Sequence, residues 1–237
     1  MKKSGQVTIF IIIAVVIVGA VGGYFLLRGE SSNEDRIYTP DVEGVREFVQ
    51  DCFDEASLIG MYEFGEQKNP STQNLNSEGL PYYYSGDQNL LPSKIDLGGE
   101  ISNYILESFS LCIGDFENFE NLEISSRQPS VNVEIENLKV STELNYDLNV
   151  KKIGSESSSN LKEAYSSEVD IKMGKMYEVI ENIVSIDTTN EYGHCLTCSN
   201  ELLEENDFNM ENFEDDEEIV FVLEDSKSEF KWIFVGK

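Results

Sequence analysis

The residues best suited to chemistry form a short cluster, His194, Cys195 and Cys198. A Cys-x-x-Cys pair can act as a redox dithiol when it opens a helix, because the helix N-terminus lowers the pKa of the first thiol. Residues 199–205 suit such a helix, but 189–193 have the composition of a loop rather than of the strand that precedes a thioredoxin-like motif. Nearby carboxylates would also raise the pKa of a thiol. Thiol–disulfide activity is therefore an alternative, and a structural role is the prediction.

The same cluster contains residue types that bind zinc. A structural zinc site needs four ligands, and His194, Cys195 and Cys198 supply three. Only Cys52 or Cys112 could complete the site from elsewhere in the chain. Zinc binding at this cluster is a second alternative, and we predict that the protein holds no metal or cofactor.

The chain has four cysteines, Cys52, Cys112, Cys195 and Cys198. An even number favours disulfides in a domain outside the cytoplasm, and four cysteines allow three pairings. We favour Cys52 with Cys112 because both lie on the apolar faces of similar predicted helices. We favour Cys195 with Cys198 because they are close neighbours.

Motifs for other enzymatic reactions are missing from the sequence. His194 is the only histidine, so a Ser-His-Asp triad would have to use it. There is no Gly-x-Ser-x-Gly elbow, phosphate-binding loop or dinucleotide fingerprint. Nothing singles out two of the 45 acidic residues as a glycosidase pair. We therefore predict that the protein is not an enzyme.

Acidic residues dominate the chain, which has a formal net charge of −28. This charge opposes binding to nucleic acid or to an anionic membrane surface, and it suits cations, basic partners or a salty medium. Residues 201–218 contain ten acids and no base. Because they lack an Asp-x-Asp-x-Asp-Gly loop, weak calcium binding is only an alternative, and we expect a solvated or disordered surface there.

Residues 7–27 carry no charge and would form a helix about 31 Å long, which matches the hydrocarbon core of a bilayer. Lys2 and Lys3 precede this segment, so the positive-inside rule places 1–6 in the cytoplasm and the rest of the chain outside. The sequence thus predicts a single-pass protein of the cell membrane, with a polar linker at 28–40 and an acidic domain at 41–237.

A cleaved signal peptide is the alternative to this anchor, because 19–23 contain small residues that suit a signal peptidase. The apolar segment is longer than is usual for such a peptide, so we expect it to be retained. Gly19 and Gly23 have the spacing that lets two membrane helices approach closely. An anchor-mediated homo-oligomer is one partner arrangement, and a protein of the cell envelope is another.

The first residues, 2–10, read KKSGQVTIF. They resemble the start of archaeal type IV pilin-like precursors, and this resemblance implies cleavage between Gly5 and Gln6. Phe10 stands where those precursors have glutamate, and the helical pattern ends at 29–35, where a pilin stalk would continue. The opening and the Cys-bearing helix that follows also resemble uncharacterised single-pass proteins of small-genome archaea.

Two amphipathic helices are predicted beyond the linker. Apolar residues recur at helical spacing over 41–59, and Cys52 lies on the apolar stripe. Residues 100–116 repeat this pattern with Cys112 on the stripe, and the glycines at 98–99 mark the predicted start.

The rest of the domain shows strand patterns and one more helix. The expected strands are 81–84, 131–135, 138–150 (after a tight turn or bulge at 136–137), 162–172 and a hairpin of 219–223 with 230–235, and the expected helix is 173–186. These elements predict an α+β fold, with an antiparallel sheet of about five strands and two or three helices packed on one face.

Overall fold

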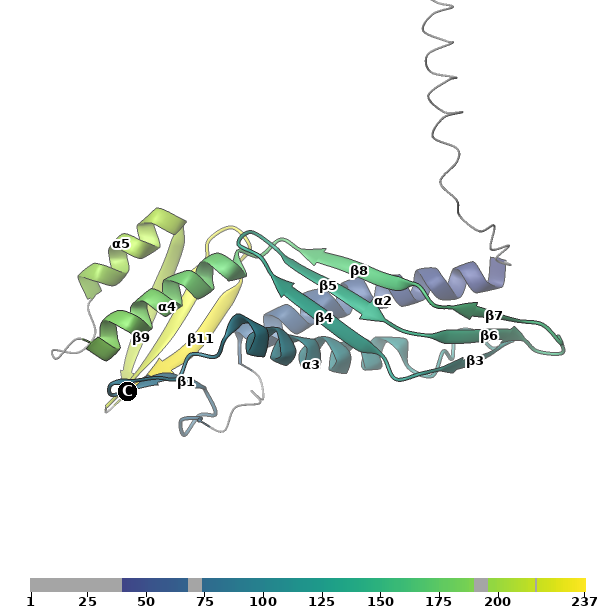
Figure 1. The fold of residues 1–237 in the computed structure, drawn as a ribbon, viewed down its shortest axis with the longest axis horizontal. Helices are drawn as coiled ribbons and strands as arrows, with labels where there is room; N and C mark the ends of the chain where they lie inside the picture. The colour runs from purple at the N-terminus through teal and green to yellow at the C-terminus, as the bar shows by residue number, and fades with distance from the viewer. Residues whose placement is uncertain (1–39, 68–73, 190–195, 216) are drawn as a thin grey trace, which may run out of the picture. The chain divides into compact units, whose positions relative to one another are not determined.

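A computed structural model describes residues 40–67, 74–189, 196–215 and 217–237, which belong to one compact unit spanning 40–237. These residues form a mixed α+β fold with four helices and several sheets, which confirms the predicted class (Figure 1). No helix within these ranges has the length and apolar character needed to cross a bilayer. The predicted anchor at 7–27 lies outside the described residues, as do Gly5, Gln6, Gly19 and Gly23.

Two long helices, α2 (Pro40–Gly65) and α3 (Lys94–Ile113), pack against each other. They run in opposite directions, because Phe53 contacts Phe109 while the later Phe64 contacts the earlier Tyr104. The stripe predicted for the first helix is largely buried, and α2 continues six residues beyond the predicted end at 59. A disulfide joins the two helices.

Helix α3 begins at Lys94, so the prediction that 98–99 opens this helix is wrong. Ser93 caps the helix by accepting a hydrogen bond from the backbone N–H of Asp96, a signal that outweighs the helix-weakening effect of two glycines. Gly98 is buried, and a Cβ there would lie 3.2 Å from the carbonyl oxygen of Val133. The glycine lets the helix approach the neighbouring strand.

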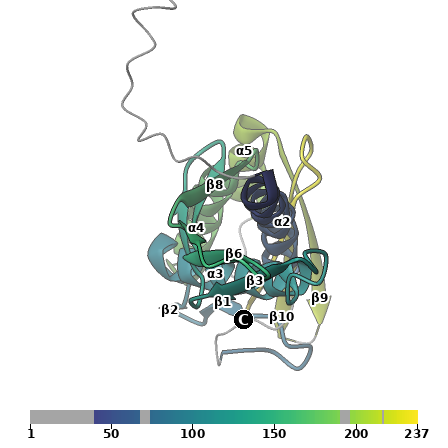
Figure 2. The same ribbon diagram turned by 90° about the vertical axis from the view of Figure 1, so that its right-hand side faces the viewer.

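A three-stranded meander covers this helix pair, and each of its long strands is interrupted once. Its elements are β3 (Leu122–Ser126), β4 (Ser130–Ile135), β5 (Val140–Asn145), β6 (Leu148–Lys152), β7 (Ser158–Leu161) and β8 (Ala164–Val169). They form two sheets with the orders β4-β5-β8 and β3-β6-β7. Figure 1 shows these sheets end to end, and Figure 2 views the molecule from the β3-β6-β7 end.

The predicted strand at 138–150 is therefore divided into β5 and β6, which belong to different sheets. The predicted turn at 136–137 is present, since the N–H of Glu136 bonds to the carbonyl of Lys139. The interruption arises because three residues, 127–129, lie opposite only two, 146–147. Pro129 is among the three and has no N–H for the ladder, so the strand bulges there.

The domain also contains a five-stranded sheet with the order β2-β1-β11-β10-β9. Its strands are β1 (Tyr82–Ser85), β2 (Gln88–Asn89), β9 (Phe208–Asp215), β10 (Glu218–Asp225) and β11 (Lys231–Gly236). The predicted hairpin of 219–223 with 230–235 is confirmed as β10 and β11. The prediction of one antiparallel sheet is wrong, because the described residues form three sheets and β1 pairs with β11 in parallel.

Helices α4 (Met173–Thr189) and α5 (Leu196–Asn206) contact strands of this sheet. The first confirms the predicted helix at 173–186 and packs against β1 and β2. Of the two alternatives expected for 201–218, a disordered surface is wrong, since the stretch forms the end of α5 and all of β9, whereas a solvated surface agrees with the exposure of most of its described side chains. Alternation of Phe208 and Met210 with polar residues, paired in register with β10, explains the strand.

Tight packing at Gly236 provides a first test of the core. A Cβ at this position would lie 2.1 Å from the ring of Tyr84, whose hydroxyl donates a hydrogen bond to Asp187 over 2.9 Å. We expect Gly236→Ala to lower the free energy of unfolding by about 1–3 kcal/mol. Gly99→Ala is the matched control, because Gly99 is exposed in α3 and a Cβ there would meet no atom within 4 Å. This variant should raise the free energy of unfolding by up to about 1 kcal/mol. Equal effects in chemical denaturation would contradict this account.

Tyrosine side chains make the fold sensitive to alkaline pH. The hydrogen bond that the Tyr82 hydroxyl donates to the Glu218 carboxylate raises the pKa of Tyr82 to about 12, and burial raises the pKa of Tyr83, Tyr84 and Tyr104 above the usual value. A phenol with a raised pKa in the folded state stabilises the fold fully below the unfolded pKa of about 10, and this contribution is lost as the pH rises further. We therefore expect stability to fall above about pH 10. Absorbance at 295 nm should show these phenols ionising together with the loss of circular dichroism, and ionisation near pH 10 in a still folded protein would contradict this.

Candidate binding site at the open edge of β3

The outer edge of β3 presents main-chain groups that the fold does not use. In the antiparallel pair with β6, the N–H of Ile153 bonds to the carbonyl of Asn121, and the N–H of Arg127 bonds to the carbonyl of Asp147. Hydrogen-bonded pairs alternate along such a ladder, so the odd-numbered residues of β3 face β6 and the even-numbered ones face away. The main-chain groups of Ile124 and Ser126 therefore point outward, and none of the described residues bonds to them.

Strand β4, which follows β3 along the same edge of the meander, also alternates between inward and outward main-chain groups, but helix α3 covers its outer edge. The carbonyl of Val131 accepts a hydrogen bond from the Ser102 hydroxyl at 2.9 Å. The carbonyl of Val133 lies against Gly98, where the absence of a side chain permits the approach. Because α3 ends at Ile113, it does not reach β3. The meander edge is thus covered over β4 and left uncovered over β3.

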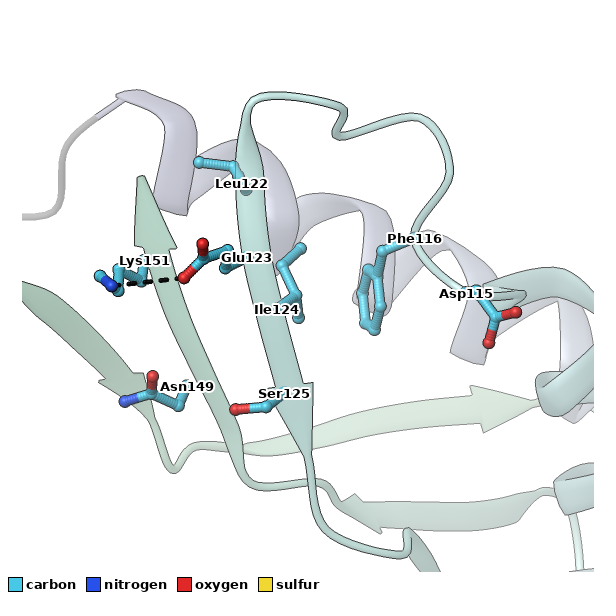
Figure 3. Close-up of a pocket in the computed structure, with 8 residues that line it drawn as sticks. All are labelled: Asp115, Phe116, Leu122, Glu123, Ile124, Ser125, Asn149 and Lys151. Atoms are coloured by element: carbon cyan, nitrogen blue, oxygen red, sulfur yellow. Dashed lines mark ion pairs between the residues drawn. The ribbon is translucent and has the colours of Figure 1, made fainter. Parts of the chain in front are cut away.

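A hollow of about 470 Å³ adjoins this uncovered edge. It is lined by residues 122–125 of β3, by Asp115 and Phe116 after α3, and by Asn149 and Lys151 of β6. Figure 3 shows Asp115 and Phe116 to one side of β3 in this view, and Asn149 and Lys151 to the other. The hollow therefore borders the strand itself.

Two smaller hollows share residues with the first. One, of about 330 Å³, includes Asp115 and extends along the end of α3 to Pro129 and Tyr146 at the interruption of the meander. The other, of about 290 Å³, includes Ser125 and Asn149. The second hollow continues along the end of α3, whereas the third crosses the sheet from β3 to Asn160 of β7 and to Lys162.

The segment after α3 is held in place by aromatic packing. Phe116 has a positive φ of 58°, which is rare for a bulky side chain. Its ring contacts Phe48 of α2 at 6.3 Å and Phe119 at 6.4 Å between centroids. The carbonyl of Phe119 also accepts a hydrogen bond from the N–H of Leu122 at the start of β3. These contacts fix the side of the hollow opposite the strand.

The segment 115–121, which leads from α3 into β3, is acidic, and its first residue, Asp115, lines the hollow. Lys151 pairs with Glu123 at 3.3 Å, which neutralises both. The exposed carboxylates of Asp115, Glu117 and Glu120 have no ion-pair partner among the described residues. The site combines free main-chain donors and acceptors with the adjoining acidic segment 115–121, so its geometry suits the binding of another molecule.

Among the described residues, the structure brings together two of those singled out in the sequence. A disulfide joins Cys52 and Cys112, as favoured, with their Cα atoms 5.6 Å apart. It ties the C-terminal end of α3 to α2 and so supports the adjacent hollow. Cys198 lies in α5, whereas His194 and Cys195 lie outside the described residues, so the zinc and dithiol alternatives remain predictions. No group of three or more potential metal ligands occurs within the described ranges.

Sequence reasoning missed the site because β3 was not predicted. Leu122 and Ile124 alternate with Glu123 and Ser125, but a pattern over five residues is too short to separate from a loop. The signal that points to the site is the end of α3, where the helix stops at Gly114 while the strands continue.

Comparison of the chain with protein-family models, with curated proteins and with solved structures finds no match.

Proposed function

We propose that this chain is a single-pass membrane protein whose domain, 41–237, acts outside the cytoplasm by binding a partner in the cell envelope, without catalysis. The observation that carries the proposal is the uncovered edge of β3 beside a hollow of about 470 Å³. The uncharged segment 7–27 supports the anchor, and the disulfide between Cys52 and Cys112 agrees with an oxidising compartment.

Site-specific cross-linking in the native host tests the binding role. A photoreactive benzoylphenylalanine replacing Ser125, which lines two of the hollows, should give a discrete adduct of higher mass. The same replacement at Asn200, exposed on α5, is the matched control and should give none. Absence of an adduct at Ser125, or identical adducts at both positions, would overturn the proposal.

Membrane orientation is tested separately with right-side-out vesicles. Protease added outside should digest the domain at 41–237, and the anchor should stay with the membrane after an alkaline carbonate wash. A protected domain would overturn the extracytoplasmic placement, and release by carbonate would overturn the anchor.

A pilin-like subunit is the second candidate, and it rests on the resemblance of residues 2–10 to archaeal precursors. N-terminal sequencing of the native protein decides it. A chain that starts at Gln6 supports this candidate, and a chain that starts at Met1 or Lys2 removes it.

A further inference from the structure

We propose that the partner contributes an extended, positively charged segment that adds a strand to the outer edge of β3. This proposal deepens the binding role above and rests on it. It names the class of ligand, a stretch of polypeptide in β conformation that carries lysine or arginine.

Main-chain geometry favours a strand. An incoming strand lies about 4.8 Å from its neighbour and pairs with outward-pointing N–H and C=O groups, which are those of Ile124 and Ser126 here. Natural proteins usually block such edges with proline, inward charges or a covering element. On β4 the covering element is α3, whereas β3 is bordered by the hollow of about 470 Å³ instead.

The acidic segment 115–121, which leads into β3, favours a positively charged ligand. Asp115, Glu117 and Glu120 are exposed and stand unpaired within the described ranges, so basic side chains on the incoming strand would meet opposite charge. A second copy of this chain is a poor occupant. Both copies would carry the formal net charge of −28, and like charge on two molecules opposes their association.

A binding measurement with the full chain in detergent micelles tests this inference. The probe is a fluorescein-labelled, capped octapeptide of alternating lysine and valine, and its counterpart carries glutamate in place of lysine. Fluorescence anisotropy should show binding of the lysine peptide alone. Equal binding of the glutamate peptide would overturn the assignment of a basic ligand.

Proline substitution locates the site. Ile124→Pro removes an outward N–H that the fold does not use, a position at which edge strands tolerate proline. It should weaken binding of the lysine peptide by about tenfold or more. Asn212→Pro is the matched control, because β9 is also an edge strand and Asn212 faces away from β10 by the same alternation. Binding should then stay within about twofold of the parent.

Charge removal gives an independent readout. The triple variant Asp115→Asn, Glu117→Gln and Glu120→Gln should weaken binding and flatten its dependence on salt. Each variant is checked for native circular dichroism, and hydrogen exchange on the parent should show protection of 122–126 when the peptide binds.

Unchanged affinity in Ile124→Pro, or loss of affinity only in Asn212→Pro, would overturn the inference. If cross-linking at Ser125 succeeds while these tests fail, the binding role stands and only the ligand class is wrong.

Discussion

Replacing both Cys52 and Cys112 with alanine is expected to lower the free energy of unfolding by about 4 kcal/mol. The disulfide closes a loop with a sequence separation of 60, and the chain-entropy relation gives about that value for a loop of this length. The Cys52 side chain is also buried in the helix pair, so the fold offers no water to replace the lost contact. Because this disulfide fixes the end of α3, the hollow beside β3 should loosen as well.

Guanidinium unfolding of the full chain in micelles measures this effect. Trp232 is the only tryptophan and is fully buried, so its fluorescence reports the loss of the five-stranded sheet. The parent protein treated with reductant is the control and should unfold at nearly the same denaturant concentration as the double variant. A loss below about 1 kcal/mol would show that the helix pair is held by packing alone.

Asp225→Ala is expected to cost about 3–5 kcal/mol, because it removes one partner of a buried ion pair. The Asp225 carboxylate lies 3.3 Å from the Lys172 ammonium, and their side chains are only 2% and 18% exposed. Lys172 also lies over the ring of Phe208 and near the carbonyl of Asn206. The pair therefore joins the start of α4 to the end of α5 and to the turn between β10 and β11.

A surface ion pair provides the matched control for this variant. Lys139, in the turn before β5, pairs with Glu168 of β8, and their side chains are 33% and 61% exposed. Glu168→Ala removes the same charge and should cost less than about 1 kcal/mol, since exposed pairs are screened by water. The prediction is contradicted if the two variants lose equal stability in parallel denaturant titrations.

Helices and local hairpins were predictable because short-range patterns specify them. The stripe around Cys52, the turn at 136–137 and the hairpin of 219–223 with 230–235 all appear in the structure. The bulge at 127–129 was not predictable, since it depends on which residues lie opposite across the sheet. The parallel pairing of β1 with β11 depends on contacts between distant parts of the chain, which no local period reveals.

The candidate site is harder to predict than the fold, because it depends on where one element ends relative to another. The outward groups of Ile124 are free only because α3 ends before it reaches β3, whereas Ser102 covers the equivalent edge on β4. Neither the end of α3 nor β3 carries a sequence motif. The disulfide that supports the site was predicted from helix stripes, but that prediction said nothing of the strand beside it.

The parallel pairing of β1 with β11 has a consequence for folding kinetics. Tyr82 pairs with Val235, 153 residues later in the chain, whereas the meander is built from neighbouring hairpins. Contacts between distant residues form slowly, because a long loop must close before they are gained. We therefore expect the meander and its helix pair to acquire protection from hydrogen exchange first, and the pairing of β1 with β11 to acquire it last.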